Sequence, residues 1–223
     1  MTETTIALPS RHYRTRGARR ADLWVHISGL LLAVFGGSFL IVRSALHADG
    51  AMVAAVVVYV IGLATMFLCS AAYNFARASR QPLLRKLDHA GIFVMIAGSY
   101  TPLLVHALSG TWQWSMTLTV WAIALFGVFA KLCLPGLGKG FWVAIYLLLG
   151  WVGMAAVKPI VQSLDMPVLI LIAAGGLIYT IGVFFYMSKR LVYFRAIWHG
   201  HVLAAAIVHW AAMLLCVGPQ QAG

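Results

Sequence analysis

The chain has 223 residues, of which 62% are hydrophobic and only 9% are charged, and its mean hydropathy is +0.92. A soluble domain of this size could not bury so much apolar surface, so the composition excludes that class and indicates a polytopic membrane protein. The net charge of +11 does not indicate a nucleic-acid partner, because the cations lie in short segments between apolar runs, as in membrane proteins.

The sequence divides into a basic arm at residues 1–22, a membrane domain at 23–217 and a short tail at 218–223. Seven apolar runs follow one another in the membrane domain, at 23–42, 51–72, 88–108, 112–130, 141–157, 167–187 and 197–217. Each run approaches the roughly 20 residues that a helix needs to cross the hydrocarbon core. The sequence therefore predicts an all-α fold, a bundle of seven transmembrane helices.

Lysine and arginine are distributed unevenly between the two sides that seven spans would create. Of the 16 cations, 14 lie in the arm and in the second, fourth and sixth loops, and only Arg43 and Lys158 lie on the other side. Positively charged loops stay in the cytoplasm. We therefore expect a cytoplasmic N-terminus and an external C-terminus.

Asp88 is the acidic residue that abuts an apolar run without a polar spacer. The other acids, Glu3, Asp22, Asp49 and Asp165, lie in polar segments or at their edges. A carboxylate at the membrane edge is costly unless it is paired, which makes Asp88 a candidate catalytic residue. The alternative is an anchor at the start of a helix, where the positive end of the helix dipole favours an acid.

Two further pairs of polar residues fall at the membrane level of Asp88. Ser70 and Asn74 leave the second run toward the cytoplasm, and Arg195 and His199 enter the seventh run from the same side. Residues four apart share a helix face. These side chains can therefore meet in the inner third of the bundle, unless they are unrelated interfacial positions.

Three long motifs occur in order along the chain: LDHAGIFVMIAGSYTP at 87–102, YLLLGWVGMAAVKP at 146–159 and GGLIYTIGVFFYMSKRLVYFRAIWH at 175–199. With them the chain resembles the bacterial hemolysin III family of the progestin and adipoQ receptor superfamily, over nearly its whole length. The resemblance implies a seven-helix protein of the bacterial inner (cytoplasmic) membrane, with a cytoplasmic N-terminus and membrane lipids as partners.

The resemblance also implies a zinc site near the cytoplasmic side, in which three imidazoles bind the metal and an aspartate holds a water. Such an open zinc site suits hydrolysis, and receptor relatives are linked to hydrolysis of lipid amides. Ser70, Asp88 and His199 match the pattern, whereas Asn74 and Arg195 stand where two imidazoles are expected. The resemblance therefore implies a degenerate metal site in this chain.

We expect no cofactor, although zinc remains possible with His199 as one ligand. His26, in the first run, is a spare candidate ligand at the same level, but a membrane histidine more often bonds a neighbouring helix. Without metal, a charged Asp88 needs a cation close by. A guanidinium suits a carboxylate, so we expect an Arg195–Asp88 ion pair, with Asn74 and His199 as further donors to the same carboxylate.

These observations favour a hemolysin III-type membrane protein with a degenerate site, acting without catalysis in membrane lipid or energy homeostasis. One alternative is a zinc-dependent hydrolase of a lipid amide that uses Asp88, His199 and a third ligand such as His26. Another is a proton-linked transporter or channel with Asp88 and His199 as a relay, although no matching acid or base continues the path outward. The sequence leaves open whether the protein is an enzyme and which oligomer it forms.

The expected orientation can be tested with a reporter that is active only in the cytoplasm. The reporter should be silent when fused after Gly223 and active when inserted near Ala78, because the cation-rich second loop lies on the cytoplasmic side. The opposite pair of activities would contradict seven spans with a cytoplasmic N-terminus.

Overall fold

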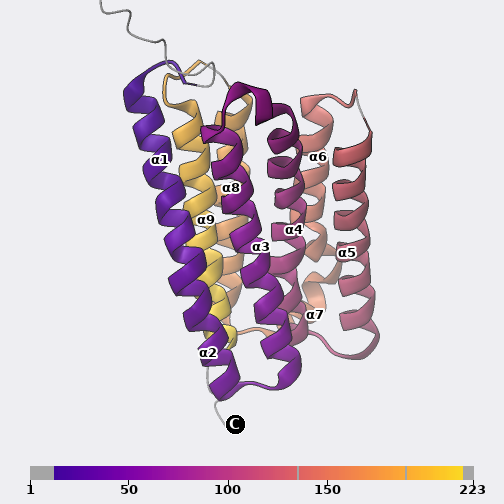
Figure 1. Cartoon of the computed structure of the whole chain (residues 1–223). Helices are drawn as coiled ribbons and strands as arrows, with labels where there is room; N and C mark the ends of the chain where they lie inside the picture. The colour runs from indigo at the N-terminus through magenta and orange to yellow at the C-terminus, as the bar shows by residue number, and fades with distance from the viewer. Residues whose placement is uncertain (1–12, 135, 189, 218–223) are drawn as a thin grey trace, which may run out of the picture.

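The structure, a computed structural model, describes residues 13–134, 136–188 and 190–217. Residues 1–12 of the expected arm and the expected tail at 218–223 lie outside these ranges. Within the described residues the secondary structure is helical, and the helices pack side by side in one bundle (Figure 1). Helix α1 begins at one end of the bundle and α9 ends at the opposite end, as an odd number of crossings requires.

Seven stretches of the described chain are long and apolar enough to cross a membrane, which confirms the predicted fold. Four of them are single helices: α3 (Gly50–Phe75), α5 (Gly110–Cys133), α8 (Met166–Met187) and α9 (Phe194–Cys216). The first span joins α1 (Arg16–Leu31), a π-helical turn (Leu32–Gly36) and α2 (Gly37–His47). In the third, a 3-10 turn (Ala78–Arg80) leads into α4 (Gln81–Ala107).

Helix α1 begins inside the stretch expected as an arm, because Thr15 provides a helix cap. The Thr15 hydroxyl accepts a hydrogen bond from the backbone N–H of Ala18 at 3.1 Å, a bond that satisfies one of the free donors of a helix start. The buried residues of α1 are Ala18, Asp22, His26 and Gly29. Their spacing of three or four residues places them on one face, which packs into the bundle against α3 and α9.

The fifth span is broken within the membrane domain into α6 (Lys139–Gly150), a 3-10 segment (Val152–Ala156) and α7 (Val157–Ser163). Backbone groups freed by such a break need partners in an apolar environment. Tyr100 of α4 supplies them: its hydroxyl donates to the Gly150 carbonyl at 2.7 Å and accepts from the Gly153 N–H at 3.0 Å. Hydrogen bonds to α4 therefore stabilise the break in the fifth span.

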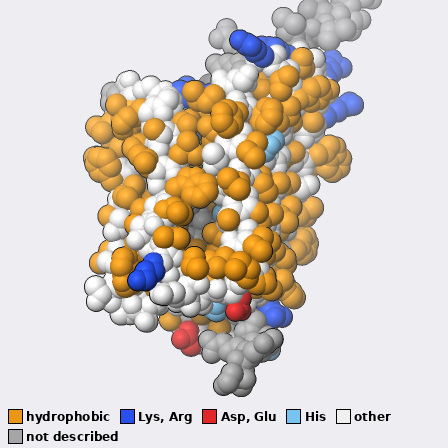
Figure 2. Space-filling model, turned by 180° about the vertical axis from the view of Figure 1, so that it is seen from behind, with side chains coloured by type: hydrophobic (Ala, Val, Ile, Leu, Met, Phe, Trp, Pro, Cys, Tyr) orange, Lys and Arg blue, Asp and Glu red, His pale blue; other side chains and the backbone are white. Residues whose placement is uncertain are grey.

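Helices α3 and α4 form the closest pair in the bundle, because glycines face each other's backbone. A Cβ atom on Gly62 would lie 3.1 Å from the Val94 carbonyl oxygen, and one on Gly98 would lie 3.2 Å from that of Val58. Small residues let membrane helices approach in this way. On the outer surface, hydrophobic side chains cover most of the face shown in Figure 2, as contact with lipid requires.

Candidate functional site

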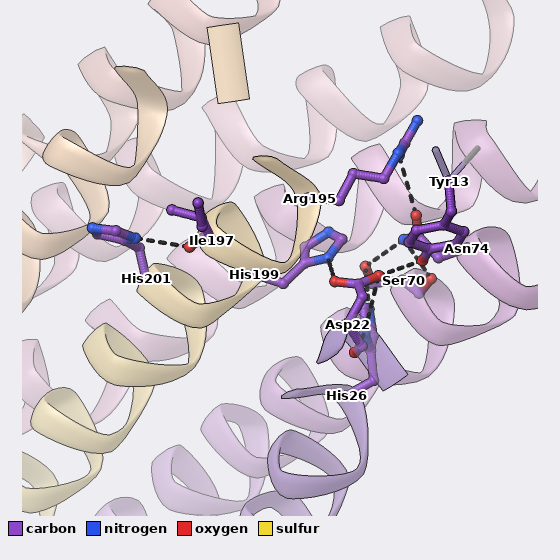
Figure 3. Close-up of polar contacts among 9 residues, drawn as sticks. All are labelled: Tyr13, Asp22, His26, Ser70, Asn74, Arg195, Ile197, His199 and His201. Atoms are coloured by element: carbon purple, nitrogen blue, oxygen red, sulfur yellow. Dashed lines mark hydrogen bonds and ion pairs between the residues drawn. The ribbon is translucent and has the colours of Figure 1, made fainter. Parts of the chain in front are cut away.

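The centre of the polar cluster is Asp22, a carboxylate that is 0% exposed. Its Oδ1 accepts a hydrogen bond from His199 Nδ1 at 2.6 Å, and its Oδ2 accepts one from the Tyr13 hydroxyl. His26 lies one turn along α1, with Nδ1 2.8 Å from the Asp22 backbone oxygen and 3.7 Å from Oδ2. Figure 3 shows these side chains converging from α1, α9 and the segment before α1.

A chain of hydrogen bonds continues from this centre to α3 and back to α9. His26 Nε2 lies 3.1 Å from the Ser70 hydroxyl. Asn74 donates through Nδ2 to the Ser70 carbonyl at 3.0 Å and to the Ser70 hydroxyl at 3.3 Å. Arg195 then donates to the Asn74 amide oxygen at 3.2 Å. Three spans that are distant in sequence are therefore joined by one polar network (Figure 3).

The partners determine which ring nitrogens carry protons. A backbone carbonyl only accepts, so His26 Nδ1 is protonated, and in the neutral ring Nε2 accepts from the Ser70 hydroxyl. An ionised carboxylate also only accepts, so His199 Nδ1 donates to Asp22. His199 Nε2 is left without a hydrogen bond to any other described residue, and His199 lines a cavity. The site thus offers one hydroxyl–imidazole pair and one available imidazole nitrogen.

That cavity occupies about 650 Å³ inside the bundle. Its polar end is lined by polar side chains of four helices: His26, Ser70, Asn74, Asp88, Arg195 and His199. From there it extends between apolar residues of α4, α7, α8 and α9, which include Ile96, Leu103, Ile160, Leu169 and Met213. A pocket with one polar end and a long apolar remainder has the shape and chemistry of an amphiphile site.

The structure brings the residues singled out in the sequence to the same region, but not in the expected pairs. Asp88 lines the cavity and interacts with Ser70 and with the charges of His199 and Arg195. Among the described residues, however, the ion pairs join Asp22 to His26 and His199, and none joins Arg195 to Asp88. The expected Arg195–Asp88 ion pair is wrong.

The reason lies in how Asn74 is held. Its amide nitrogen donates to the carbonyl and to the hydroxyl of Ser70, which turns its amide oxygen toward α9, where that oxygen accepts a hydrogen bond from the Arg195 guanidinium. The expected amide donor to Asp88 is therefore used within α3. The expected ring N–H of His199 is used by Asp22.

Sequence reasoning missed Asp22 and Tyr13. Asp22 was assigned to the edge of a polar segment, yet it precedes His26 by four residues, the spacing that places two side chains on one helix face. Tyr13 is buried at 5% exposure and stacks on Phe75, with ring centroids 6.0 Å apart. Burial raises the pKa of Tyr13, and the Asp22 charge adds to this effect, so the phenol keeps its proton and remains a donor.

Two groups of side chains in the cluster are candidate zinc sites. At the position that the resemblance implies, the fit is poor, because Arg195 is a permanent cation that bonds the Asn74 oxygen and neither of these side chains is an imidazole. Closer to α1, Asp22, His26 and His199 each offer a ligand atom, and these atoms lie within 4.8 Å of one another. Carboxylate oxygen and imidazole nitrogen are zinc ligands, and three of them suit an open site. Among the described residues, this group of three side chains is the one that could hold a metal ion.

Replacing Tyr13 with Phe should lower stability, because it removes a donor from a buried carboxylate. Hydrogen bonds to charged groups contribute about 1.5–3 kcal/mol, so we expect a loss of about 2 kcal/mol in the free energy of unfolding. Thermal unfolding in detergent measures this. The matched control is Tyr193→Phe, an exposed tyrosine, whose change should stay within about 0.5 kcal/mol. Equal stability of the two variants would contradict a structural role for the Tyr13–Asp22 bond.

Comparisons with known proteins identify the family of the chain. The family model described as "Haemolysin-III related" matches residues 19–210. The Hemolysin-3 homolog of Bacillus subtilis (strain 168) is 31% identical over 198 residues, covering 88% of this chain and 91% of that protein. Hemolysin-3 of Bacillus cereus is 28% identical over 200 residues, with 89% and 91% covered. The human Monocyte to macrophage differentiation factor is 29% identical over 164 residues, with 70% and 67% covered. The chain is an integral membrane protein that belongs to the haemolysin III family.

Proposed function

We propose that the protein binds a membrane lipid inside its bundle and acts through this binding in membrane lipid or energy homeostasis, in the bacterial cytoplasmic membrane. The observation that carries this proposal is the 650 Å³ cavity, which joins the polar cluster to a long apolar interior. Burying an acyl chain there contributes about 0.8 kcal/mol per CH₂ group relative to water. The shape of the cavity thus favours a ligand with one head and one chain.

The polar end supplies complementary groups for an oxygen-rich headgroup. Arg195 carries a permanent positive charge at this end, and His199 presents a free ring nitrogen. Asp88, at the same end, can accept hydrogen bonds from a hydroxyl or amide N–H. An acyl amide or ester with a polar head matches this combination of a cation, an acceptor nitrogen and a carboxyl group. Neither binding nor orientation of such a lipid requires a metal.

A zinc-dependent hydrolase of a lipid amide is the second candidate. It is supported by the Asp22, His26 and His199 group, whose ligand atoms lie within 4.8 Å. A bound zinc would supply a Lewis acid and a water of lowered pKa. In that case these three side chains would hold the ion, and Asp88, which lines the cavity beside them, would be placed to exchange a proton with the reacting water.

Filling the cavity should weaken lipid binding. Gly176 lines the cavity, and a Cβ there meets only the Trp151 ring at an ordinary 3.7 Å, so Gly176→Leu places a side chain in the acyl path. Displacing about three CH₂ groups should cost about 2 kcal/mol of affinity, or roughly 30-fold. Mass spectrometry of lipid extracted from purified protein measures this. Gly140→Leu is the control, because its added carbon meets nothing within 4 Å and should leave the lipid content unchanged.

Metal analysis of the purified protein separates the two candidates. We expect substoichiometric zinc in wild type, and a gain of zinc in the double variant Asn74→His with Arg195→His, because it restores two imidazoles and removes a cation. Asn74→His alone should gain none, since Arg195 remains. If wild type instead carries one zinc per chain, and His26→Ala loses it, the hydrolase with zinc at Asp22, His26 and His199 is the correct function.

A further inference from the structure

The Ser70 hydroxyl and the His26 imidazole form an arrangement that the lipid-binding proposal does not use. Ser70 Oγ lies 3.1 Å from His26 Nε2, and the protonated His26 Nδ1 lies 2.8 Å from the Asp22 backbone oxygen. A nucleophile bonded to a base, with the base oriented by a third group, is the arrangement that activates serine in hydrolases. Both Ser70 and His26 line the cavity, so a lipid bound there can reach the pair.

One charge beside the pair, that of the Asp22 carboxylate, has the sign that such a reaction needs. When His26 takes the serine proton it becomes an imidazolium, and the Asp22 carboxylate lies 3.7 Å from its Nδ1. This carboxylate is 0% exposed. An opposite charge at that distance, away from water, stabilises the protonated ring. The backbone carbonyl of Asp22, one turn earlier in α1, accepts from Nδ1 at 2.8 Å and keeps His26 in this tautomer.

The two residues that replace family imidazoles take part in the same arrangement. The Asn74 amide nitrogen lies 3.3 Å from Ser70 Oγ, so it is a donor beside the atom that would attack. Arg195 donates to the oxygen of that amide at 3.2 Å, and a charged partner on the oxygen polarises the N–H bonds. Such donors stabilise the oxyanion that forms on an attacked carbonyl. Together, Asn74 and Arg195 replace metal ligands with an amide donor supported by a cation.

We propose that Ser70 and His26 are a catalytic nucleophile and base that hydrolyse an acyl ester or amide of the lipid bound in the cavity, without a metal. This inference rests on the proposed lipid binding and adds a reaction to it. Ser70 Oγ forms a bond to the acyl carbon while its proton passes to His26 Nε2. The bond from the acyl carbon to the leaving oxygen or nitrogen then breaks, and the leaving group takes the proton from His26.

Water completes the reaction from the polar end of the cavity. It attacks the acyl carbon of acyl-Ser70 and gives a proton to His26, which returns that proton to Ser70 Oγ as the ester bond breaks. The products are a carboxylic acid and an alcohol or amine, and no oxidant or reductant is consumed. His199 Nε2, which has no hydrogen-bond partner among the described residues, is available to receive the proton of the acid product.

A long-chain alkyl fluorophosphonate tests the pair in the full-length protein in detergent, with a chelator present. The reagent forms a serine O–P bond with loss of fluoride only where a base activates the hydroxyl. We expect one label per chain, located on Ser70 by peptide mass spectrometry. Ser70→Ala should abolish it. His26→Gln should slow labelling by about 100-fold or more, and Asn74→Ala, which leaves the base in place, by about 100-fold.

The control variant is Ser44→Ala. Ser44 is a buried serine whose hydroxyl donates to the Ile41 carbonyl at 2.9 Å, so its removal should leave labelling unchanged. Thermal unfolding of each variant confirms that it is folded, and Asn74→Ala keeps the test decisive if His26→Gln is unstable. Wild type that retains co-purified lipid but is not labelled at Ser70, or that is labelled only when the chelator is left out, overturns the metal-free pair alone. Wild type with neither lipid nor label overturns both proposals.

Discussion

The burial of the Asp22 carboxylate is the constraint on which the rest of the site depends. A charged group at this position is stable only because Tyr13 and His199 donate to its two oxygens, since an unpaired carboxylate in an apolar interior is very costly. These bonds tie α1 to α9 and to the segment before α1. They also orient His26 and His199, so the chemistry of two imidazoles is determined by one acid.

The polar network determines which end of the cavity is polar. Because hydrogen bonds run from Asp22 through His26, Ser70 and Asn74 to Arg195, the polar groups of this network gather at one end of the cavity, and the remainder is mostly apolar. The broken fifth span lines the same cavity. The Tyr100 hydroxyl alone satisfies backbone groups that the break frees, so no second polar network is needed there. A lipid would therefore find its head and its chain matched by different parts of the same pocket.

Metal and serine chemistry compete for the same side chains. His26 bonds Ser70 through Nε2 and the Asp22 backbone through Nδ1, so binding an ion would remove one of these bonds. The Asp22–His199 bond, at 2.6 Å, would likewise have to give up its proton to a metal. The guanidinium of Arg195 stands where the resemblance implies a metal ligand, and its permanent positive charge disfavours a metal ion there. Because Arg195 donates to the Asn74 amide oxygen, we interpret the two residues together, as a donor and its support.

The sequence by itself determined the seven spans, because the length of each apolar run is set by the thickness of the membrane. It also placed Ser70, Asn74, Arg195 and His199 at one level, since residues four apart share a helix face. It did not determine which acid lies at the centre. Asp88 and Asp22 both stand near the start of a span, and only the rotation of α1 against α3 and α9, set by packing at Ala18 and Gly29, turns Asp22 inward. The tertiary structure also decided which side chains of the cluster are hydrogen-bonded to each other. Such a bond depends on the distance between two helices, and the spacing of residues along one helix does not give that distance.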